Sequence, residues 1–331
     1  MANNNIVKVT EDIYCIRLPL PFELNFVNIY LVKSGEKIIL IDSGWHNLES
    51  LNCLTESLND LNIDISDINM IVLTHSHPDH FGLAGEIKTR ANLQILMHKR
   101  EHLLASNRFD NPKIITQSLI SWVKTFGVLQ KDIGSIPDLE YLNENSSKVD
   151  VYVDDGYHID AENLKVIWTP GHSPGHICVY RSKDNALFVG DHILPQTTPI
   201  IPLTPFSTDN PLGDYLNSLN KTKSLNVKIA LPSHGHPITD VNTRITEIED
   251  HHKLRLDEIY DALSGSKTLL EVASSISWSP GQFSSLTGWG RLSALLESLS
   301  HLRHLERKGL INQIDTKDAT KFTKNVASNS N

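Results

Sequence analysis

The sequence contains few cysteines and no long hydrophobic run, and these two absences exclude several classes of protein. Its 331 residues include three cysteines, Cys15, Cys53 and Cys178, which have no paired spacing. Such cysteines are typical of buried or incidental thiols in a reducing compartment, not of a disulfide scaffold. No run of about eighteen apolar residues occurs, so no membrane-spanning helix is expected. Because the polar start also does not resemble a signal peptide, we expect a soluble, cytoplasmic protein with no membrane partner.

An excess of positive charge is also missing. The sequence holds 30 Lys and Arg against 39 Asp and Glu, which gives a formal net charge of -9. A molecule of this charge repels polyanions and anionic membrane surfaces as a whole, so nucleic acid is not its default partner. Hydrophobic residues make up 40% of the chain. That is enough for one large and one small domain, each with its own core.

Strand patterns alternate with helical patterns in the first two thirds of the chain. Short strands are predicted between residues 6 and 42, and leucines from Leu48 to Leu61 then follow helical spacing. The apolar run INMIVL predicts a buried strand that ends at the segment THSHPDH. Other predicted strands also end beside polar residues, in TPGH, VGDH and LPSHGH. Residues at the ends of successive strands of a layered α/β protein meet at one edge of its sheets.

Two regions depart from this alternation. Residues from about 99 to 147 carry apolar residues at helical spacing, which predicts a helical insertion within a catalytic domain spanning 1–241. The region 242–324 reads as a long helix, a short helix and a leucine-faced helix, followed by two small strands. This order predicts a winged-helix module, and the polar residues 325–331 are expected to form a disordered tail.

The stretch LTHSHPDHFGLAG concentrates three histidines and an aspartate within six residues. His75 and His77 lie two positions apart, so both rings can reach one ion from a bent loop. Asp79 and His80 follow at once and can face a second ion nearby. Imidazole combined with carboxylate suits Zn²⁺, and also Fe²⁺ or Mn²⁺. The alternative, a surface turn that is rich in histidine by chance, fits poorly with so dense a motif behind a buried strand.

Three further candidate ligands lie at strand ends later in the chain: His172, Asp191 and His234. Together with the motif they make five histidines and two aspartates. A pair of metals about 3.5–4 Å apart needs about this number of ligands, with one carboxylate shared between the two ions.

These segments closely resemble the metallo-β-lactamase superfamily. LIDSG, THSHPDH, TPGHSPGH, GDH and SHGH occur in the order and strand context of that family, over roughly residues 10 to 240. The resemblance implies an αββα sandwich with a dinuclear site at one edge, holding two Zn²⁺ per chain. It further implies which residues bind each ion: His75, His77 and His172 bind the first, Asp79, His80 and His234 bind the second, and Asp191 bridges them.

Several neighbouring polar residues are assigned supporting places. Asp42 in LIDSG matches a family position that supports the metal loop by hydrogen bonds, and we expect that role here rather than a ligand role. His46 and His192 are interpreted as loop or supporting residues. His176 and His236 stand beside ligands, but the family pattern places the metal on the first histidine of each pair.

The reaction expected from two adjacent cations is hydrolysis. The ions lower the pKa of a shared water to near neutrality, so that metal-bound hydroxide attacks a polarised carbonyl or phosphoryl group. Asp79 can orient the hydroxide and receive its proton. If the insertion folds over the metals, Trp122, Phe126 and the flanking isoleucines would line an apolar pocket that suits the hydrophobic acyl group of an ester, thioester or lactone. Alternatively, these residues pack only the core of the insertion.

Two rival activities use the same motif. A metallo-β-lactamase domain followed by a winged helix also resembles a mitochondrial single-strand endoribonuclease, and a nuclease needs a basic face. From Val241 to Asn331 the chain carries eleven Lys and Arg and eleven Asp and Glu, so the module favours packing or a homodimer over phosphate binding. Other relatives hold a single iron and oxidise persulfides, as sulfur dioxygenases, but the full ligand set favours two metals. The lack of an export signal argues against β-lactamase activity.

Overall fold

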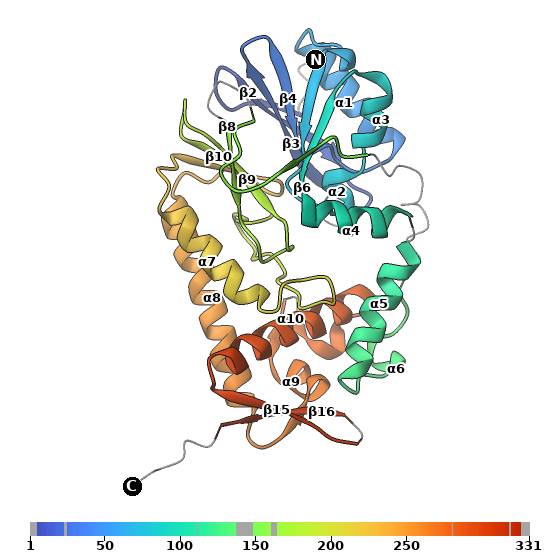
Figure 1. The fold of residues 1–331 in the computed structure, drawn as a ribbon, viewed down its shortest axis with the longest axis vertical. Helices are drawn as coiled ribbons and strands as arrows, with labels where there is room; N and C mark the ends of the chain where they lie inside the picture. Colours follow the sequence, from blue (N-terminus) through green and yellow to red (C-terminus); the bar gives the residue numbers. More distant parts are fainter. Residues whose placement is uncertain are drawn as a thin grey trace.

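The computed structural model of the chain describes residues 5–22, 25–110, 112–136, 148–159, 164–279, 281–317 and 319–325. Its two larger β-sheets lie in the upper part of the molecule as drawn in Figure 1. The larger sheet has seven strands that neighbour each other in chain order: β1 (Ile6–Lys8), β2 (Ile13–Pro19), β3 (Phe26–Ser34), β4 (Lys37–Ile41), β5 (Ile68–Val72), β6 (Gln94–His98) and β7 (Val151–Val153). Pairing is antiparallel up to β4 and parallel from β4 to β7.

The smaller sheet contains four strands. Its order is β11 (Ile229–Pro232), β10 (Ala186–Gly190), β9 (Ile177–Arg181) and β8 (Leu164–Trp168). Strands β8, β9 and β10 pair antiparallel, and β11 joins β10 in parallel. Residues such as Tyr30 and Phe188, whose rings lie 5.3 Å apart, join the two sheets in a buried cluster.

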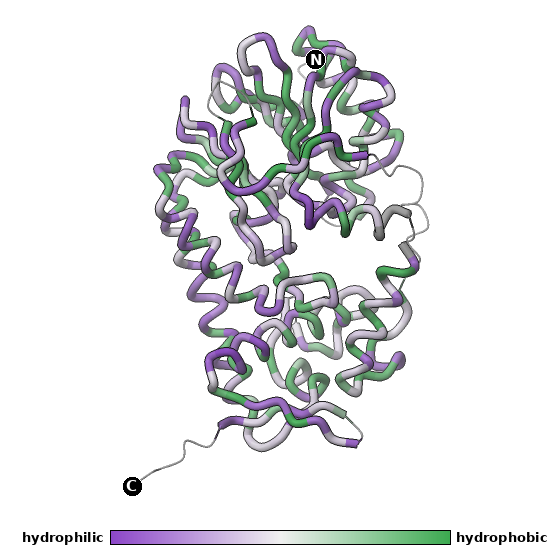
Figure 2. The backbone as a smooth tube through the Cα atoms, viewed as in Figure 1, coloured by the Kyte–Doolittle hydropathy of each residue, from purple (hydrophilic) through white to green (hydrophobic). Residues whose placement is uncertain are grey.

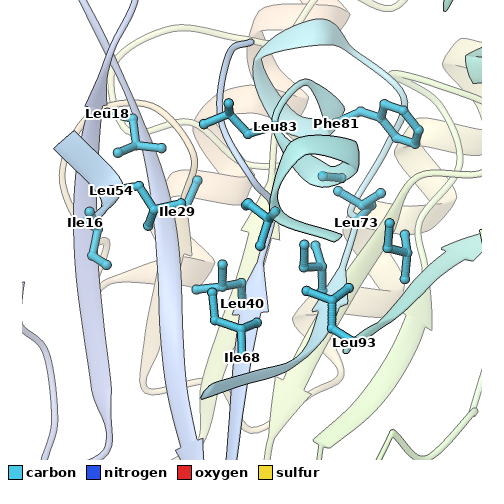
Figure 3. Packing of buried hydrophobic residues seen from close by; sticks show 14 of the residues in the cluster. Ile16, Leu18, Ile29, Leu40, Leu54, Ile68, Leu73, Phe81, Leu83 and Leu93 are labelled. Carbon is cyan, nitrogen blue, oxygen red and sulfur yellow. The ribbon is translucent and has the colours of Figure 1, made fainter. Parts of the chain in front are cut away.

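Helices cover the outer face of each sheet. Against the larger sheet lie α1 (Leu48–Asp60), α2 (Pro78–Phe81) and α3 (Ala84–Arg90). Figure 3 shows this packing, with Leu54 of α1 beside Ile16 and Ile29 of the sheet. Against the smaller sheet lie α7 (Pro211–Lys223) and α8 (Val241–Ala262). The layer order is therefore αββα. Helices of the outer layers are amphipathic, so that their apolar side is buried against a sheet. Figure 2 shows hydrophilic and hydrophobic residues alternating along α7 and α8.

The predicted helical region after β6 contains α4 (Lys99–Asp110), α5 (Pro112–Thr125) and α6 (Gln130–Ile133). Residues 137–147 of that prediction lie outside the described part of the chain. The buried side of α5 packs against the C-terminal elements: Val123 and Phe126 share a hydrophobic cluster with α9 and α10, and the ring of Phe126 stacks 6.4 Å from that of Phe322.

The C-terminal elements follow α8. They are α9 (Leu269–Ser275) and α10 (Gly288–Arg307), a three-stranded sheet of β12 (Lys267–Thr268), β16 (Thr320–Lys324) and β15 (Ile311–Asp315), and a small pair, β13 (Ser277–Trp278) with β14 (Gly281–Gln282). Asn325, the first residue of the predicted tail, is held by its backbone N–H to the carbonyl oxygen of Leu310, and residues 326–331 lie outside the described part. None of the described helices is both long enough and apolar enough to cross a membrane.

Candidate metal centre

The predicted ligands gather where strands of both sheets end. His75 and His77 lie in the loop after β5, and Asp79 and His80 lie in the single turn of α2, which Pro78 begins. The remaining three follow strands of the smaller sheet: His172 after β8, Asp191 directly after β10 and His234 after β11. Side chains from residues 75 to 234 therefore meet in one place because the two sheets bring these strand ends to the same edge.

One group of ligands comprises His75, His77, His172 and Asp191, with donor atoms within 4.8 Å of one another. His77 presents Nδ1, which lies 2.9 Å from His75 Nε2 and 3.1 Å from His172 Nε2. Two nitrogens that bind one tetrahedral zinc at about 2.0–2.1 Å are separated by about 3.3 Å. The three rings are thus spaced as ligands of a single ion.

The other group comprises Asp79, His80 and His234. Asp79 Oδ2 lies 3.2 Å from His234 Nε2 and 3.6 Å from His80 Nε2. Asp191 stands between the groups: its Oδ2 is 3.7 Å from His172 Nε2 and 3.6 Å from His80 Nε2, and its Oδ1 is 3.6 Å from His234 Nε2. This is the position that a carboxylate bridging two ions occupies.

The donor atoms fit a pair of metal ions. His80 Nε2 and Asp191 Oδ1 are buried and make no hydrogen bond with any described residue, and buried polar atoms are seldom left without a partner. Burial, followed by the proximity of the neighbouring histidines, lowers the pKa of His75 well below its ordinary value, so its imidazole is neutral and free to donate a lone pair. Neutral imidazoles and ionised carboxylates are the donors that zinc uses.

The carboxylates are correspondingly ionised. Burial alone would raise the pKa of Asp191, but the nearby imidazoles of His234 and His80 outweigh it and hold the pKa well below its usual range. Conversely, burial lowers the pKa of His80, while the carboxylates of Asp79 and Asp191 outweigh that effect and raise it. The negative charge gathered here attracts cations.

Asp42 supports the ligands through four hydrogen-bond contacts. Its Oδ1 accepts from the Thr74 backbone N–H at 2.8 Å, and its Oδ2 accepts from Thr74 Oγ1 at 2.9 Å and Ser233 Oγ at 3.4 Å. Oδ2 also lies 2.8 Å from His80 Nδ1. A proton on Nδ1 would bond this carboxylate and leave Nε2 of His80 to bind metal. Asp42 has a φ of 62°, a conformation that aspartate tolerates better than most residues.

One contributor was not identified from the sequence as part of the site. Glu101 of α4 is fully buried, and its carboxylate accepts from the backbone N–H groups of Ser76, at 2.9 Å, and Gly175, at 2.7 Å. It thus joins the two loops that carry His75, His77 and His172. In the sequence it reads only as an acidic residue in the first turn of a helix, so no signal distinguished it.

His176, predicted not to be a ligand, lies behind the site. Its Nε2 accepts from the Asp191 backbone N–H at 3.3 Å, and its Nδ1 lies 2.9 Å from Thr169 Oγ1. Gly190 makes this approach possible: its φ is +50°, and a Cβ there would lie 2.7 Å from His176 Nε2. His192 is also buried, with Nε2 3.2 Å from Thr222 Oγ1, whereas His236 is exposed.

An apolar cavity of about 590 Å³ opens directly over the ligands, beside a second of about 260 Å³. Both share the ligands His77 and His172 as part of their walls. Their shared apolar walls come from three segments: Ile115 and Leu119 of α5, Ile200 of the loop before α7, and Trp289 of α10. The structure places Trp122 and Phe126, predicted for this pocket, elsewhere: they line a separate cavity with residues of α10 and the β15–β16 hairpin.

Comparison with known proteins agrees with this geometry. The model of the family described as the metallo-beta-lactamase superfamily matches residues 23–234. A Bacillus subtilis protein named "Probable metallo-hydrolase YqjP" is 31% identical over 268 residues, which are 76% of this chain and 80% of that protein. A Caenorhabditis elegans protein named "Beta-lactamase-like protein 2 homolog" is 31% identical over 252 residues, 74% of this chain and 68% of that protein.

Solved structures extend the similarity along the chain. A metallo-beta-lactamase family protein of Thermus thermophilus has a TM-score of 0.80 and 26% identity, and the match covers 96% of this chain and 100% of that one. A beta-lactamase domain protein of Burkholderia ambifaria has a TM-score of 0.79 and 22% identity, covering 98% of this chain and 96% of that one, and shows the shared fold.

Proposed function

The chain belongs to the metallo-beta-lactamase superfamily, and from this we propose that it is a dinuclear metallo-hydrolase, with zinc as the first choice of metal. Its proposed substrates are hydrophobic acyl esters, thioesters or lactones. The observation that carries this proposal is the apolar cavity that opens onto His77, Asp79 and His172. A cavity of this kind favours substrates with a hydrophobic group close to the reacting bond.

The ligand residues would place the chemistry at the floor of the cavity. Bound metal ions would supply an activated water and would polarise the substrate carbonyl. Asp79 Oδ2 faces both His80 and His234, and Asp79 itself lines the cavity. Its carboxylate is therefore positioned to take up a proton during the reaction.

The cavity walls would hold the acyl group. Ile115 and Leu119 of α5 and Trp289 of α10 surround the approach to His77 and His172, so an acyl chain buried there loses contact with water. We further propose that the C-terminal elements form a winged-helix-like module whose role is to complete this wall. The numbers of acidic and basic residues from Val241 onward are equal, which favours such a packing role over nucleic-acid binding.

A side-by-side assay tests the proposed substrate class. Zinc-loaded protein would be incubated with a medium-chain acyl thioester and, separately, with a single-stranded RNA oligonucleotide; the Asp79→Ala variant, checked for native circular dichroism, is the blank. We expect the thioester to be cleaved and the RNA to stay intact. Cleavage of RNA alone would overturn the acyl-hydrolase proposal, and equal turnover by Asp79→Ala would overturn the site itself.

A further inference from the structure

Another group of buried metal-binding residues lies away from the centre described above, between α8 and α10, which pack together in Figure 1. His252 of α8 faces Glu297 and His301 of α10, and one donor atom of each residue lies within 4.8 Å of the other two. Glu297 and His301 are four residues apart on a helix, so they share one face. Both histidines are fully buried and Glu297 is 9% exposed.

The trio is buried in the interface between the two helices. The ring of Tyr215 lies 5.4 Å from that of His252, and His251 and Arg255 are also near. Burial raises the pKa of Glu297 to about 7, against the opposing effect of Arg255, and burial lowers the pKa of His301 to about 3. Three ionisable side chains in a buried interface cost free energy unless they hydrogen-bond to one another or bind an ion.

The distance between the two histidines is similar to those in the candidate metal centre. His252 Nδ1 lies 3.2 Å from His301 Nε2. In the metal centre, His77 Nδ1 lies 2.9 Å from His75 Nε2 and 3.1 Å from His172 Nε2. Nitrogens on one tetrahedral zinc are separated by about 3.3 Å, from Zn–N bonds of about 2.0–2.1 Å. A hydrogen bond between the two rings would have a similar length, so zinc binding has to be measured to distinguish the two.

His301 has the orientation of a metal ligand. His301 Nδ1 lies 2.9 Å from the backbone carbonyl oxygen of Glu297, so Nδ1 must carry the proton that it donates there. Its Nε2 therefore has a free lone pair directed at His252. The ligand His172 is held in the same way, with Nδ1 2.8 Å from the carbonyl oxygen of Ile200. A backbone carbonyl that fixes one ring nitrogen while the other binds metal is the usual arrangement of histidine ligands.

We infer that His252, Glu297 and His301 form a separate divalent-cation site that fastens α8 to α10. Two histidines and one glutamate are a donor set used for zinc. The nearby positive charge of Arg255 is offset by Glu258, at 2.7 Å, and its guanidinium lies 5.1 Å from the ring centre of Trp278. Glu297 also lines a cavity of about 320 Å³. This site does not depend on the proposed hydrolytic function.

The test counts zinc ions in the full-length protein. Wild type, Glu297→Gln and His301→Leu would be dialysed against the same buffered free Zn²⁺, and bound zinc would be measured by mass spectrometry. We expect each variant to hold about one ion per chain less than wild type, or to bind that ion at least about 10-fold more weakly. His304→Leu is the matched control, because His304 is also a buried histidine of α10 but lies outside the trio; it should keep the wild-type zinc content.

Thermal unfolding gives a readout that is independent of catalysis. Zn²⁺ raises the stability of a folded state that binds it, so the zinc-dependent increase in Tm should be smaller in Glu297→Gln and His301→Leu than in His304→Leu. Glu297→Gln keeps the size of the side chain, so it carries the test if His301→Leu does not fold. Equal zinc content and equal Tm increments in wild type and Glu297→Gln would overturn the inference and leave a hydrogen-bonded histidine pair.

Discussion

The Asp42 carboxylate makes several of the hydrogen bonds that hold the candidate metal ligands in place. It accepts from Thr74 and Ser233 and lies 2.8 Å from His80 Nδ1. We predict that Asp42→Asn weakens metal binding by about 10–100-fold, because the amide cannot accept as many hydrogen bonds and loses the negative charge behind His80. Asparagine tolerates the positive φ at this position, so the fold should persist.

Zinc retention against a graded series of chelator concentrations measures this effect. Activity of Asp42→Asn should return at high free zinc, since the substitution acts on metal occupancy. An unchanged retention curve would show that the hydrogen bonds of Asp42 do not govern binding of the metal.

Glu101 makes a different contribution, since it ties loops together. Glu101→Gln leaves one of the backbone N–H groups of Ser76 and Gly175 facing an amide NH₂ instead of an oxygen. We predict a loss of about 1–3 kcal/mol in the free energy of unfolding, the cost of one unsatisfied buried donor. Urea unfolding in chelator measures it without the contribution of metal, and an unchanged midpoint would contradict the bracing role.

The sequence singled out the candidate ligands but not Glu101, for a physical reason. A metal ion needs particular donor types at particular strand ends, so THSHPDH, His172, Asp191 and His234 stand out by their chemistry. A carboxylate that accepts from backbone N–H groups needs no particular sequence partner. Its role depends on two loops that are 74 and 25 residues away along the chain.

At the scale of elements, α5 sets one wall of the cavity. Ile115 is 7% exposed and lines the cavity, whereas the adjacent Ile114 is 50% exposed. We predict that Ile115→Ala raises KM for long acyl thioesters by about 10-fold and for short ones much less, because only the long chains lose the apolar contact. Ile114→Ala is the matched control and should leave the chain-length profile unchanged. The same profile in both variants would show that α5 does not touch the substrate.

The helical pattern of α5 was predicted correctly, but its orientation was not available from the sequence. Trp122, Phe126 and the flanking isoleucines were expected in the pocket, and of these Ile115 lines it. Trp122 and Phe126 instead face α10 and the β15–β16 hairpin. Helical periodicity shows that a helix has an apolar side, but it does not show which partner that side meets. Ile115 and Leu119 of α5 line the metal-centre cavity, whereas Val123 packs against the C-terminal elements.

At the scale of the whole molecule, a group of charged side chains around Asp12 connects the two sheets. Asp12, just before β2, binds Arg181 of β9 at 3.0 Å and Lys183 at 2.6 Å. The hydrogen bond from Lys183, followed by that from Arg181, lowers the pKa of Asp12 below its ordinary value of 3.8. The folded state therefore binds the proton less readily than the unfolded chain does.

The resulting stability is fully present above the ordinary pKa of aspartate and is lost as the pH falls through the lower pKa of the folded state. We predict that Asp12→Asn lowers the urea midpoint at about pH 7 and that its deficit relative to wild type shrinks below about pH 4, as Asp12 of wild type takes up a proton. Unfolding curves of both proteins from about pH 3 to 7 measure this difference. A deficit that is constant over the whole range would contradict the ionic origin.

The cavity walls also have a consequence for the order in which the protein is made. All of the predicted ligands precede residue 235, whereas Trp289, which closes the cavity from α10, follows more than fifty residues later. During synthesis the chain would thus acquire its complete set of candidate ligands, and the α5 part of the cavity wall, before Trp289 completes that wall. Exchanging the sequence from Val241 onward between relatives should therefore change the substrate preference and leave the candidate metal centre in place.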